Sequence, residues 1–266
     1  MPFVLRSLLV LALGFAAPAR AEVVCTLLVD EASGAVLLEE GDCAARATPA
    51  STFKLALAVI GFEAGILQDA GHPVLQIAAG DPDWGGAEWR KPTTPERWLR
   101  YSVVWYSQRI TRALGAAKLT EATRALGYGN ADFSGDAGFD NGLERAWIGS
   151  SLQISPREQV AFLRKLALGE LPVSAQAQMK ARGIVQTWQV AGWRIKGKTG
   201  TAYPRHADRS FDYAKGWGWF VGWAEAEGQG VVFARLTRGE APGSPGTLTR
   251  QAMLAEWPAL MARLGR

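Results

Sequence analysis

The most reactive arrangement in the sequence is a serine followed three residues later by a lysine. Ser51 and Lys54 stand at the start of a segment in which residues 55–60 are all apolar. Residues at i and i+3 share one face of a helix, and a helix that is apolar all round is buried. Burial lowers the pKa of a lysine from its usual value of about 10.4. A neutral amine beside a hydroxyl is a base beside a nucleophile, so the pair predicts covalent catalysis by Ser51.

Three further short motifs follow Ser51 and Lys54 in the chain. Ser-x-x-Lys and the Ser-x-Val at 102–104 each occur about once by chance in a chain of this length, so neither is specific alone. Lys-Thr-Gly at 198–200 is expected about 0.06 times, and Tyr-Gly-Asn at 128–130 about 0.02 times. The combination in this order is therefore a strong indication of an acyl-transfer site, with the Tyr-Gly-Asn motif interpreted as mostly structural.

The elements that must position these motifs follow from the hydrophobic periodicity. Apolar or alternating runs near both ends predict strands at 23–29, 35–39, 192–200, 215–224 and 231–237. Helical patterns are found at 51–65, 95–114, 120–126, 156–168 and 248–264. Strands at both ends around a helical middle predict an α+β fold: an antiparallel sheet with a largely α-helical insertion.

One helix start is readable in detail. Ser155 is the expected N-cap, Pro156 takes the first helical position, and Glu158 completes a capping box. This fixes the start of the helix at 156–168 and places Trp147 on the loop before it.

Composition excludes several classes of protein. The chain has 266 residues, a formal net charge of +4, 48% hydrophobic and 20% charged residues, which excludes a disordered chain and a polytopic membrane protein. The basic residues are spread along the chain, so no nucleic-acid partner is indicated.

The first 21 residues are typical of a secretory signal peptide. Arg6 precedes an apolar run at 8–17, and Ala19-Arg20-Ala21 fits the small-x-small cleavage rule. The run is too short for a membrane span, so the mature protein is expected to comprise residues 22–266 without an anchor.

Export makes a disulfide plausible for the two cysteines. Cys25 and Cys43 are the whole cysteine content of the chain, which suits one disulfide in an oxidising compartment, with two buried free thiols as the alternative. A zinc site is disfavoured because His72 and His206 are the only histidines and lie far apart in the sequence.

The motifs resemble those of the class D (oxacillinase-type) serine β-lactamases. The resemblance rests on Ser-Thr-Phe-Lys at 51–54, Ser-x-Val, Tyr-Gly-Asn and Lys-Thr-Gly in this order, with Trp147 before an Ile-Ser-Pro helix start at 154–156. Ser-x-Val with Tyr-Gly-Asn favours class D over class A. The family fold has an antiparallel sheet with N- and C-terminal helices packed on it, formed here by about 22–50 and 185–266. A mainly α-helical part, at about 51–184, would complete it, with the active site between the two.

The resemblance implies a covalent mechanism with a modified lysine. Ser51 would become the acyl-enzyme, and Lys54 would be N6-carboxylated by CO2 and act as general base. An uncharged amine is what reacts with CO2, and the apolar surroundings of Lys54 favour that state. Trp147 would donate its indole N–H to the carboxyl group, the alternative being a tryptophan that only packs in the core. No metal and no other cofactor is implied.

The remaining catalytic roles are also implied by the resemblance. Ser102 would relay a proton to the leaving nitrogen with the help of a cationic Lys198. The backbone N–H groups of Ser51 and Thr201 would form the oxyanion hole.

The substrate carboxylate would be bound at the Lys-Thr-Gly strand. Lys198, Thr199 and Arg250 are the implied ligands, although Arg235 and Arg238 lie nearby in the sequence and leave the choice of arginine open. Trp105, Tyr106, Ala202 and Tyr203 are expected to line the substrate region. The implied substrate-binding residues are Val104, Thr199, Gly200, Thr201 and Arg250.

The sequence thus predicts a periplasmic enzyme, monomeric or homodimeric, that hydrolyses penicillin-type antibiotics and gives resistance to them. Two alternatives share the motifs: a β-lactam sensor that is acylated without turnover, and a penicillin-binding transpeptidase or carboxypeptidase. The spectrum of β-lactams hydrolysed is not predicted.

Overall fold

A six-stranded antiparallel sheet runs through the part of the chain that the computed structural model describes, residues 21–241 and 243–266. The strand order is β2-β1-β6-β5-β4-β3, so the N-terminal hairpin pairs with the last strand in the sequence. The strands are β1 (Glu22–Asp30), β2 (Val36–Gly41), β3 (Thr187–Val190), β4 (Trp193–Ala202), β5 (Gly216–Ala226) and β6 (Gln229–Gly239).

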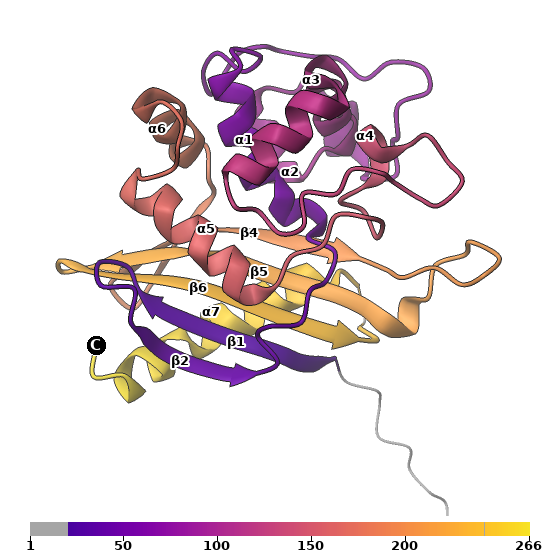
Figure 1. Cartoon of the computed structure of the whole chain (residues 1–266). Helices are drawn as coiled ribbons and strands as arrows, with labels where there is room; N and C mark the ends of the chain where they lie inside the picture. The colour runs from indigo at the N-terminus through magenta and orange to yellow at the C-terminus, as the bar shows by residue number, and fades with distance from the viewer. Residues whose placement is uncertain (1–20, 242) are drawn as a thin grey trace, which may run out of the picture.

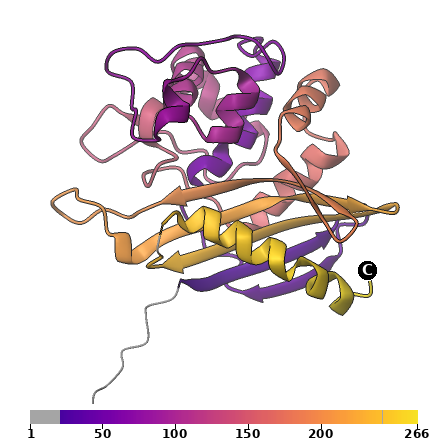
Figure 2. The same ribbon diagram turned by 180° about the vertical axis from the view of Figure 1, so that it is seen from behind.

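Helices cover both faces of this sheet (Figures 1 and 2). The helix α7 (Pro245–Arg263) lies along one face, and α5 (Pro156–Leu168) crosses the other. A helical region stands beyond α5 on that second face. It consists of η1 (Ala50–Thr52), α1 (Phe53–Glu63), η2 (Ala87–Arg90), α2 (Pro95–Tyr101), α3 (Val104–Ala125), α4 (Gly142–Arg145) and α6 (Ala175–Gly183). The α+β class and the antiparallel sheet predicted from the sequence are confirmed.

The two faces of the sheet bury separate hydrophobic cores. On β5, Trp219 and Trp223 join the large core shared with the helical region, whereas Phe220 packs with Phe233 and Trp257 beneath α7. Side chains alternate between the faces of a strand, so one apolar strand serves both cores. The sheet is therefore held on both sides and forms a rigid support for residues on β4.

The helix expected at 95–114 is broken, and this correction matters for the site. Ser102 adopts a left-handed conformation (φ 56°, ψ 35°) after α2 ends, and α3 begins at Val104. The helix then continues past the expected gap to Ala125, with a kink at Gly115. The motif serine was thus placed inside a helix by its periodicity, but it occupies the turn between two helices.

Besides the short helices η2, α4 and η3 (Tyr213–Lys215), the elements α6 and β3 were not predicted. The helix α6 buries few residues and has no pronounced apolar stripe, and β3 is a four-residue strand at the edge of the sheet. Neither gives the periodic pattern on which an expectation could rest.

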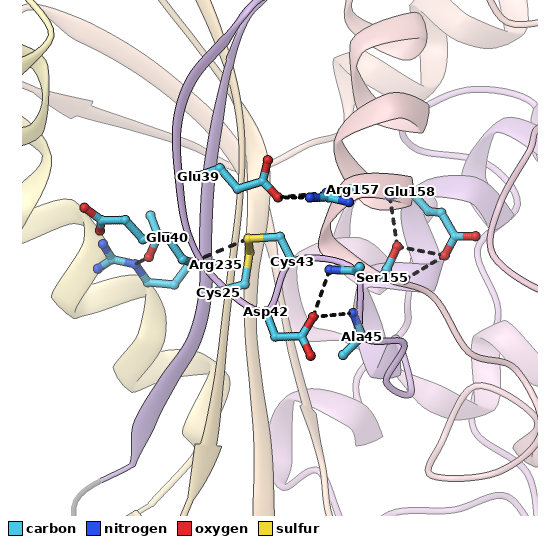
Figure 3. The surroundings of a disulfide bond; sticks show 12 residues. Cys25, Glu39, Glu40, Asp42, Cys43, Ala45, Ser155, Arg157, Glu158 and Arg235 are labelled. Carbon is cyan, nitrogen blue, oxygen red and sulfur yellow. Dashed lines mark hydrogen bonds and ion pairs between the residues drawn. A yellow bond between two sulfur atoms is a disulfide. The ribbon is translucent and has the colours of Figure 1, made fainter.

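Cys25 and Cys43 form a disulfide with an S–S distance of 2.06 Å, so the free-thiol alternative is wrong (Figure 3). The bond joins β1 to the segment that leaves β2 and leads to η1. This segment is also tied to α5, because Arg157 N–H donates to the Cys43 carbonyl at 3.2 Å. By the chain-entropy model a loop of this size contributes about 3 kcal/mol.

The predicted signal peptide, residues 1–21, lies almost wholly outside the described residues. Across 21–241 and 243–266, no helix has the length and apolar character that crossing a membrane requires. The same residues contain no cluster of three or more His, Cys, Asp or Glu side chains placed to hold a metal ion.

Candidate active site

Ser51 lies in a strained turn at the start of α1. The preceding residue, Ala50, has a φ of 50°, a conformation that non-glycine residues seldom adopt. Thr52 stabilises the turn through two hydrogen bonds. Its hydroxyl donates to the Pro49 carbonyl at 2.7 Å and accepts from Gln159 Nε2 at 2.7 Å. Ser51 is therefore presented by a fixed turn rather than by a free loop.

Lys54 is fully buried one turn further along. Its side chain is 0% exposed, and its Nζ lies 3.2 Å from Ser51 Oγ. Burial holds the pKa of Lys54 well below its ordinary value, and the charge of Lys198 lowers it further. Burial thus favours the neutral amine, which is the form that can act as a base or a nucleophile.

Trp147 has a buried indole N–H without an acceptor. The side chain is 0% exposed, its ring centroid is 5.6 Å from that of Phe53, and no hydrogen-bond partner of Nε1 is found in the described part of the chain. A buried donor left unpaired costs about 1–3 kcal/mol. The buried indole N–H beside Phe53 is thus a donor for which the described side chains supply no acceptor.

A second serine–lysine pair is assembled from distant parts of the chain. Lys198 on β4 donates from Nζ to Ser102 Oγ at 2.5 Å and to the Thr199 carbonyl at 3.0 Å. Burial lowers the pKa of Lys198 to about 7, and the charge of Arg250 contributes. With a pKa near 7 the amine can both hold and release a proton at neutral pH, and the cationic role that the resemblance implies for Lys198 stays a prediction.

A cavity of about 760 Å³ opens over these pairs. Ser51 and Ser102 are exposed in it, whereas Lys54 and Lys198 approach the two hydroxyl groups from the buried side. Of the residues predicted from the sequence, the cavity is lined by Ser51, Ser102, Thr199, Thr201, Ala202, Tyr203 and Arg250.

The three arginines that the sequence left open occupy different positions, and the choice of carboxylate ligand among them stays a prediction. Among Arg235, Arg238 and Arg250, Arg250 is the one that lines the cavity, where its guanidinium lies 5.3 Å from the ring centroid of Trp188. Arg235 pairs with Glu256 at 2.6 Å, and Arg238 lies over the Trp217 ring. Burial lowers the pKa of Arg250, although a guanidinium remains charged.

Gly200 and Val104 support the site without lining the cavity. A Cβ on Gly200 would lie 2.8 Å from the Pro49 carbonyl oxygen and 3.1 Å from Thr52 Cγ2, so glycine lets β4 touch the turn that carries Ser51. Val104 is 4% exposed at the start of α3. Thr201 lines the cavity, and its hydroxyl lies 2.8 Å from that of Ser244 and accepts from Gly246 N–H at 3.0 Å.

The Tyr-Gly-Asn motif at 128–130 contributes to the support beneath the site. Tyr128 is fully buried and accepts from Gln159 Nε2 at 3.3 Å. Gly129 (φ 58°) allows contact with the Gln153 carbonyl, and Asn130 Nδ2 donates to the Ser151 carbonyl at 2.9 Å.

The sequence interpretation was wrong about one pair of aromatic residues. Trp105 and Tyr106 are fully buried and do not line the cavity. Trp105 instead donates from Nε1 to the Trp89 carbonyl at 3.0 Å, and Trp89 is the residue that reaches the cavity.

Several lining residues were missed because they belong to loops or short helices and form no motif. They include Trp84, Trp89, Arg100, Arg145, Ile148, Gln186, Phe211 and Tyr213. The one available signal was the local excess of tryptophan at 84–89, which does not by itself distinguish a cavity wall from a core.

Fold and motifs together match a described domain family. Residues 24–256 match the penicillin-binding protein transpeptidase domain, which places the chain among proteins that carry this acyl-transfer fold.

Curated relatives and solved structures narrow the class. The chain is 41% identical to β-lactamase OXA-9 of Klebsiella pneumoniae over 245 residues, covering 89% of this chain and 88% of that protein. It is 35% identical to β-lactamase OXA-1 of Escherichia coli, covering 81% and 76%. The crystal structure of the class D β-lactamase OXA-427 superposes with a TM-score of 0.83 at 44% identity, over 90% of this chain and 99% of that one. The chain belongs to the class D β-lactamases.

Proposed function

We propose that this protein hydrolyses the β-lactam ring of penicillin-type antibiotics through an acyl-enzyme on Ser51, and so gives resistance to them. Lys54, carrying a CO2-derived carboxyl group on its amine, is the general base. The observation on which the proposal depends is a fully buried Lys54 whose Nζ lies 3.2 Å from Ser51 Oγ, together with an unpaired buried indole N–H on Trp147.

The protonation state that burial favours for Lys54 is the one that reacts with CO2. A neutral amine has the lone pair that bonds to the carbon of CO2, and one proton leaves the nitrogen as the bond forms. Burial lowers the pKa of Lys54 and so favours this neutral form.

Trp147 fits the modification as its hydrogen-bond donor. A carboxyl group on Lys54 brings acceptor oxygens into the buried layer that contains Phe53 and Trp147, where an N–H lacks a partner. An indole N–H donates only, so it holds an anionic oxygen without taking part in proton exchange. When present, the carboxyl group supplies an anionic base, whereas an unmodified lysine can supply only a neutral amine.

In the acylation step, Ser51 Oγ loses its proton to the base and forms a bond to the lactam carbonyl carbon. The bond between that carbon and the ring nitrogen then breaks, and the nitrogen takes a proton. Lys198 and Ser102, 2.5 Å apart, are placed to deliver it, and the pKa of Lys198 near 7 suits a group that gives up and regains a proton at neutral pH.

The substrate is held by the groups around this proton path. Arg250 and Thr199 line the cavity beside Ser102 and would bind the carboxylate of the penicillin nucleus. The N–H groups of Ser51 and Thr201 would stabilise the oxyanion. Before the second step, the proton that the base took from Ser51 passes through solvent to Lys198, so that both groups regain their starting states. Water then loses a proton to the base and attacks the ester carbonyl. That proton returns to Ser51 Oγ as the ester bond breaks and the ring-opened acid leaves.

We also propose that residues 1–21 direct export and that the mature enzyme works in the periplasm. The disulfide between Cys25 and Cys43 supports this, because such bonds persist in oxidising compartments.

The deciding experiment is a progress curve with purified protein and benzylpenicillin, with and without added bicarbonate. We expect many turnovers per enzyme, sustained or raised by bicarbonate. The matched control is Ser51→Ala, which should be inactive. One equivalent of acyl-enzyme without turnover would contradict hydrolysis and favour a sensor; turnover that is indifferent to bicarbonate after CO2 is removed would contradict the role of the modification.

A further inference from the structure

The cavity above Ser51 is unusually rich in positive charge. Three arginines line it, Arg100, Arg145 and Arg250, and no aspartate or glutamate is among the described lining residues. A penicillin nucleus has one carboxylate, which Arg250 accounts for. Arg100 is largely exposed at its position near the end of α2. Arg145 also lines the cavity, but the proposed reaction gives its positive charge no role.

Arg145 is fixed at the cavity wall rather than extended into solvent. It is the last residue of α4, its side chain is 26% exposed, and its Nη2 donates to the Ile148 carbonyl at 3.4 Å. Its Nε lies 3.4 Å from Asp136 Oδ2 but makes no hydrogen bond in the described structure. The side chain is thus held at the wall by Asp136 and by the Ile148 carbonyl while part of it stays exposed.

The charge of Arg145 is only partly balanced by its neighbours. Asp136 also accepts from Arg209 Nη2 at 3.0 Å, so one carboxylate serves two guanidinium groups. Arg205 adds a third positive charge: after burial, its field is the next cause that lowers the pKa of Arg145. An anion placed beside Arg145 would offset this repulsion.

The connection between β4 and β5, which carries Arg205 and Arg209, also contains two aspartates that interact with other residues. Asp212 pairs with Lys215 at 3.1 Å, and Asp208 accepts from the Ser210 hydroxyl at 2.6 Å. Among the described residues, neither carboxylate forms an ion pair with Arg145, Arg205 or Arg209.

The chemistry of the substrate indicates which part of it meets Arg145. The lactam carbonyl carbon is bonded on one side to the nitrogen of the carboxylate-bearing ring, and on the other to the carbon that carries the acylamino side chain. Arg250 comes from α7, which packs on one face of the sheet, and Arg145 comes from α4 in the helical region on the opposite face (Figures 1 and 2). With the nuclear carboxylate at Arg250 and the carbonyl at Ser51, the acyl side chain extends toward Arg145.

We propose that Arg145 is a specificity-determining residue that binds a second carboxylate, carried on the acyl side chain of the β-lactam. The inference rests on the proposed function and adds to it a substrate class: dianionic penicillins with an α-carboxy-arylacetamido side chain. The aryl group of such a side chain has aromatic neighbours available in the same cavity, Tyr203, Phe211 and Tyr213.

The test compares benzylpenicillin with α-carboxybenzylpenicillin, which differ by the one carboxylate. The quantity measured is the ratio of kcat/KM for the α-carboxy compound to kcat/KM for benzylpenicillin. Arg145→Gln should lower this ratio about tenfold, a typical loss for one charge-assisted contact. Arg145→Lys keeps the charge and should retain most of the ratio. An unchanged ratio in Arg145→Gln overturns the proposal.

The matched control is Arg112→Gln. Arg112 pairs with Glu144, the neighbour of Arg145, but does not line the cavity. Replacing it by glutamine removes one positive charge, as Arg145→Gln does. Its ratio should stay at the wild-type value; an equal fall in both variants would mean a general field effect and would overturn the assignment to Arg145.

Failure of the proposed function gives a different result. If the wild-type protein is acylated by benzylpenicillin but does not turn over, hydrolysis is refuted, and the ratio of acylation rates tests Arg145 in the same way. Absence of acylation by either compound would refute both proposals.

Discussion

Two serine–lysine pairs meet in the site, and they are built in different ways. Ser51 and Lys54 are three residues apart and lie on one helical start, whereas Ser102 and Lys198 are brought together from the α2–α3 turn and from β4. Within the described chain, Lys54 Nζ has Ser51 Oγ as its one hydrogen-bond partner, while Lys198 donates to a hydroxyl and to a carbonyl.

The difference separates the chemistry of the two amines. Lys54 has a lone pair and few polar contacts, a state suited to forming a covalent bond. Lys198 is held by two oxygen atoms and has a pKa of about 7, a state suited to carrying a proton. The local pair is thus expected to activate the nucleophile and the long-range pair to protonate the leaving group. The following predictions test that division.

The largest effect is expected from Lys54→Ala. Removing the base should lower kcat/KM for benzylpenicillin by about 10³- to 10⁴-fold, and the residual acyl-enzyme should persist. Acylation and deacylation are measured separately by stopped flow and mass spectrometry. Turnover near the wild-type rate would break the assigned role of Lys54.

Lys198→Ala should have the next largest effect. We expect a fall of about 10²- to 10³-fold in kcat/KM, concentrated in acylation, because the leaving nitrogen loses its proton source. The matched control is Lys196→Ala, two residues earlier on β4, where the amine donates instead to the Arg182 carbonyl. If deacylation slows as much as acylation, the two pairs do not divide the work as proposed.

Trp147→Phe keeps an aromatic ring and removes the unpaired N–H. We expect turnover at low bicarbonate to fall by about 10- to 100-fold, the usual range when a group that orients a site is lost, and high bicarbonate to restore part of it. Trp219→Phe is the control, since that buried indole donates to the Thr48 carbonyl. A change in thermal stability alone, with no altered response to bicarbonate, would make Trp147 ordinary core packing.

The change in kcat/KM between pH 7 and 8 is expected to be the smallest of these effects. The protonated form of Lys198 predominates below its pKa of about 7 and is lost as pH rises, so kcat/KM should fall about tenfold for each pH unit well above 7. In Lys198→Arg the alkaline limb should move upward, because a guanidinium stays charged. A wild-type profile flat from pH 7 to 9 would refute the need for a protonated Lys198.

The local pair explains why much of this site could be predicted from the sequence. Ser51 and Lys54 share a helix face by spacing alone, and the all-apolar run after them implies burial. The capping box at Ser155 was also confirmed, because both of its contacts are local. The antiparallel sheet follows from strands at both ends of the chain.

The long-range parts could not be predicted in the same way. No periodicity indicates that Ser102 turns into a left-handed conformation, or that Arg250 rather than Arg235 or Arg238 faces the cavity. Arg145 lies on a four-residue helix without a motif, and its importance depends on charges of a distant connection. These features arise from packing between elements, which spacing along the chain does not encode.

The close contact at Gly200 has a consequence for how this enzyme can evolve. Because β4 touches the turn that carries Ser51, a side chain at Gly200 would displace the nucleophile itself. Selection for bulkier antibiotics therefore has little freedom at the Lys-Thr-Gly strand. It has more in the rim, where Trp84 is 68% and Tyr213 62% exposed and both line the cavity. New resistance variants should accordingly accumulate substitutions in the two rim segments, around 84–89 and 203–215, while position 200 remains glycine.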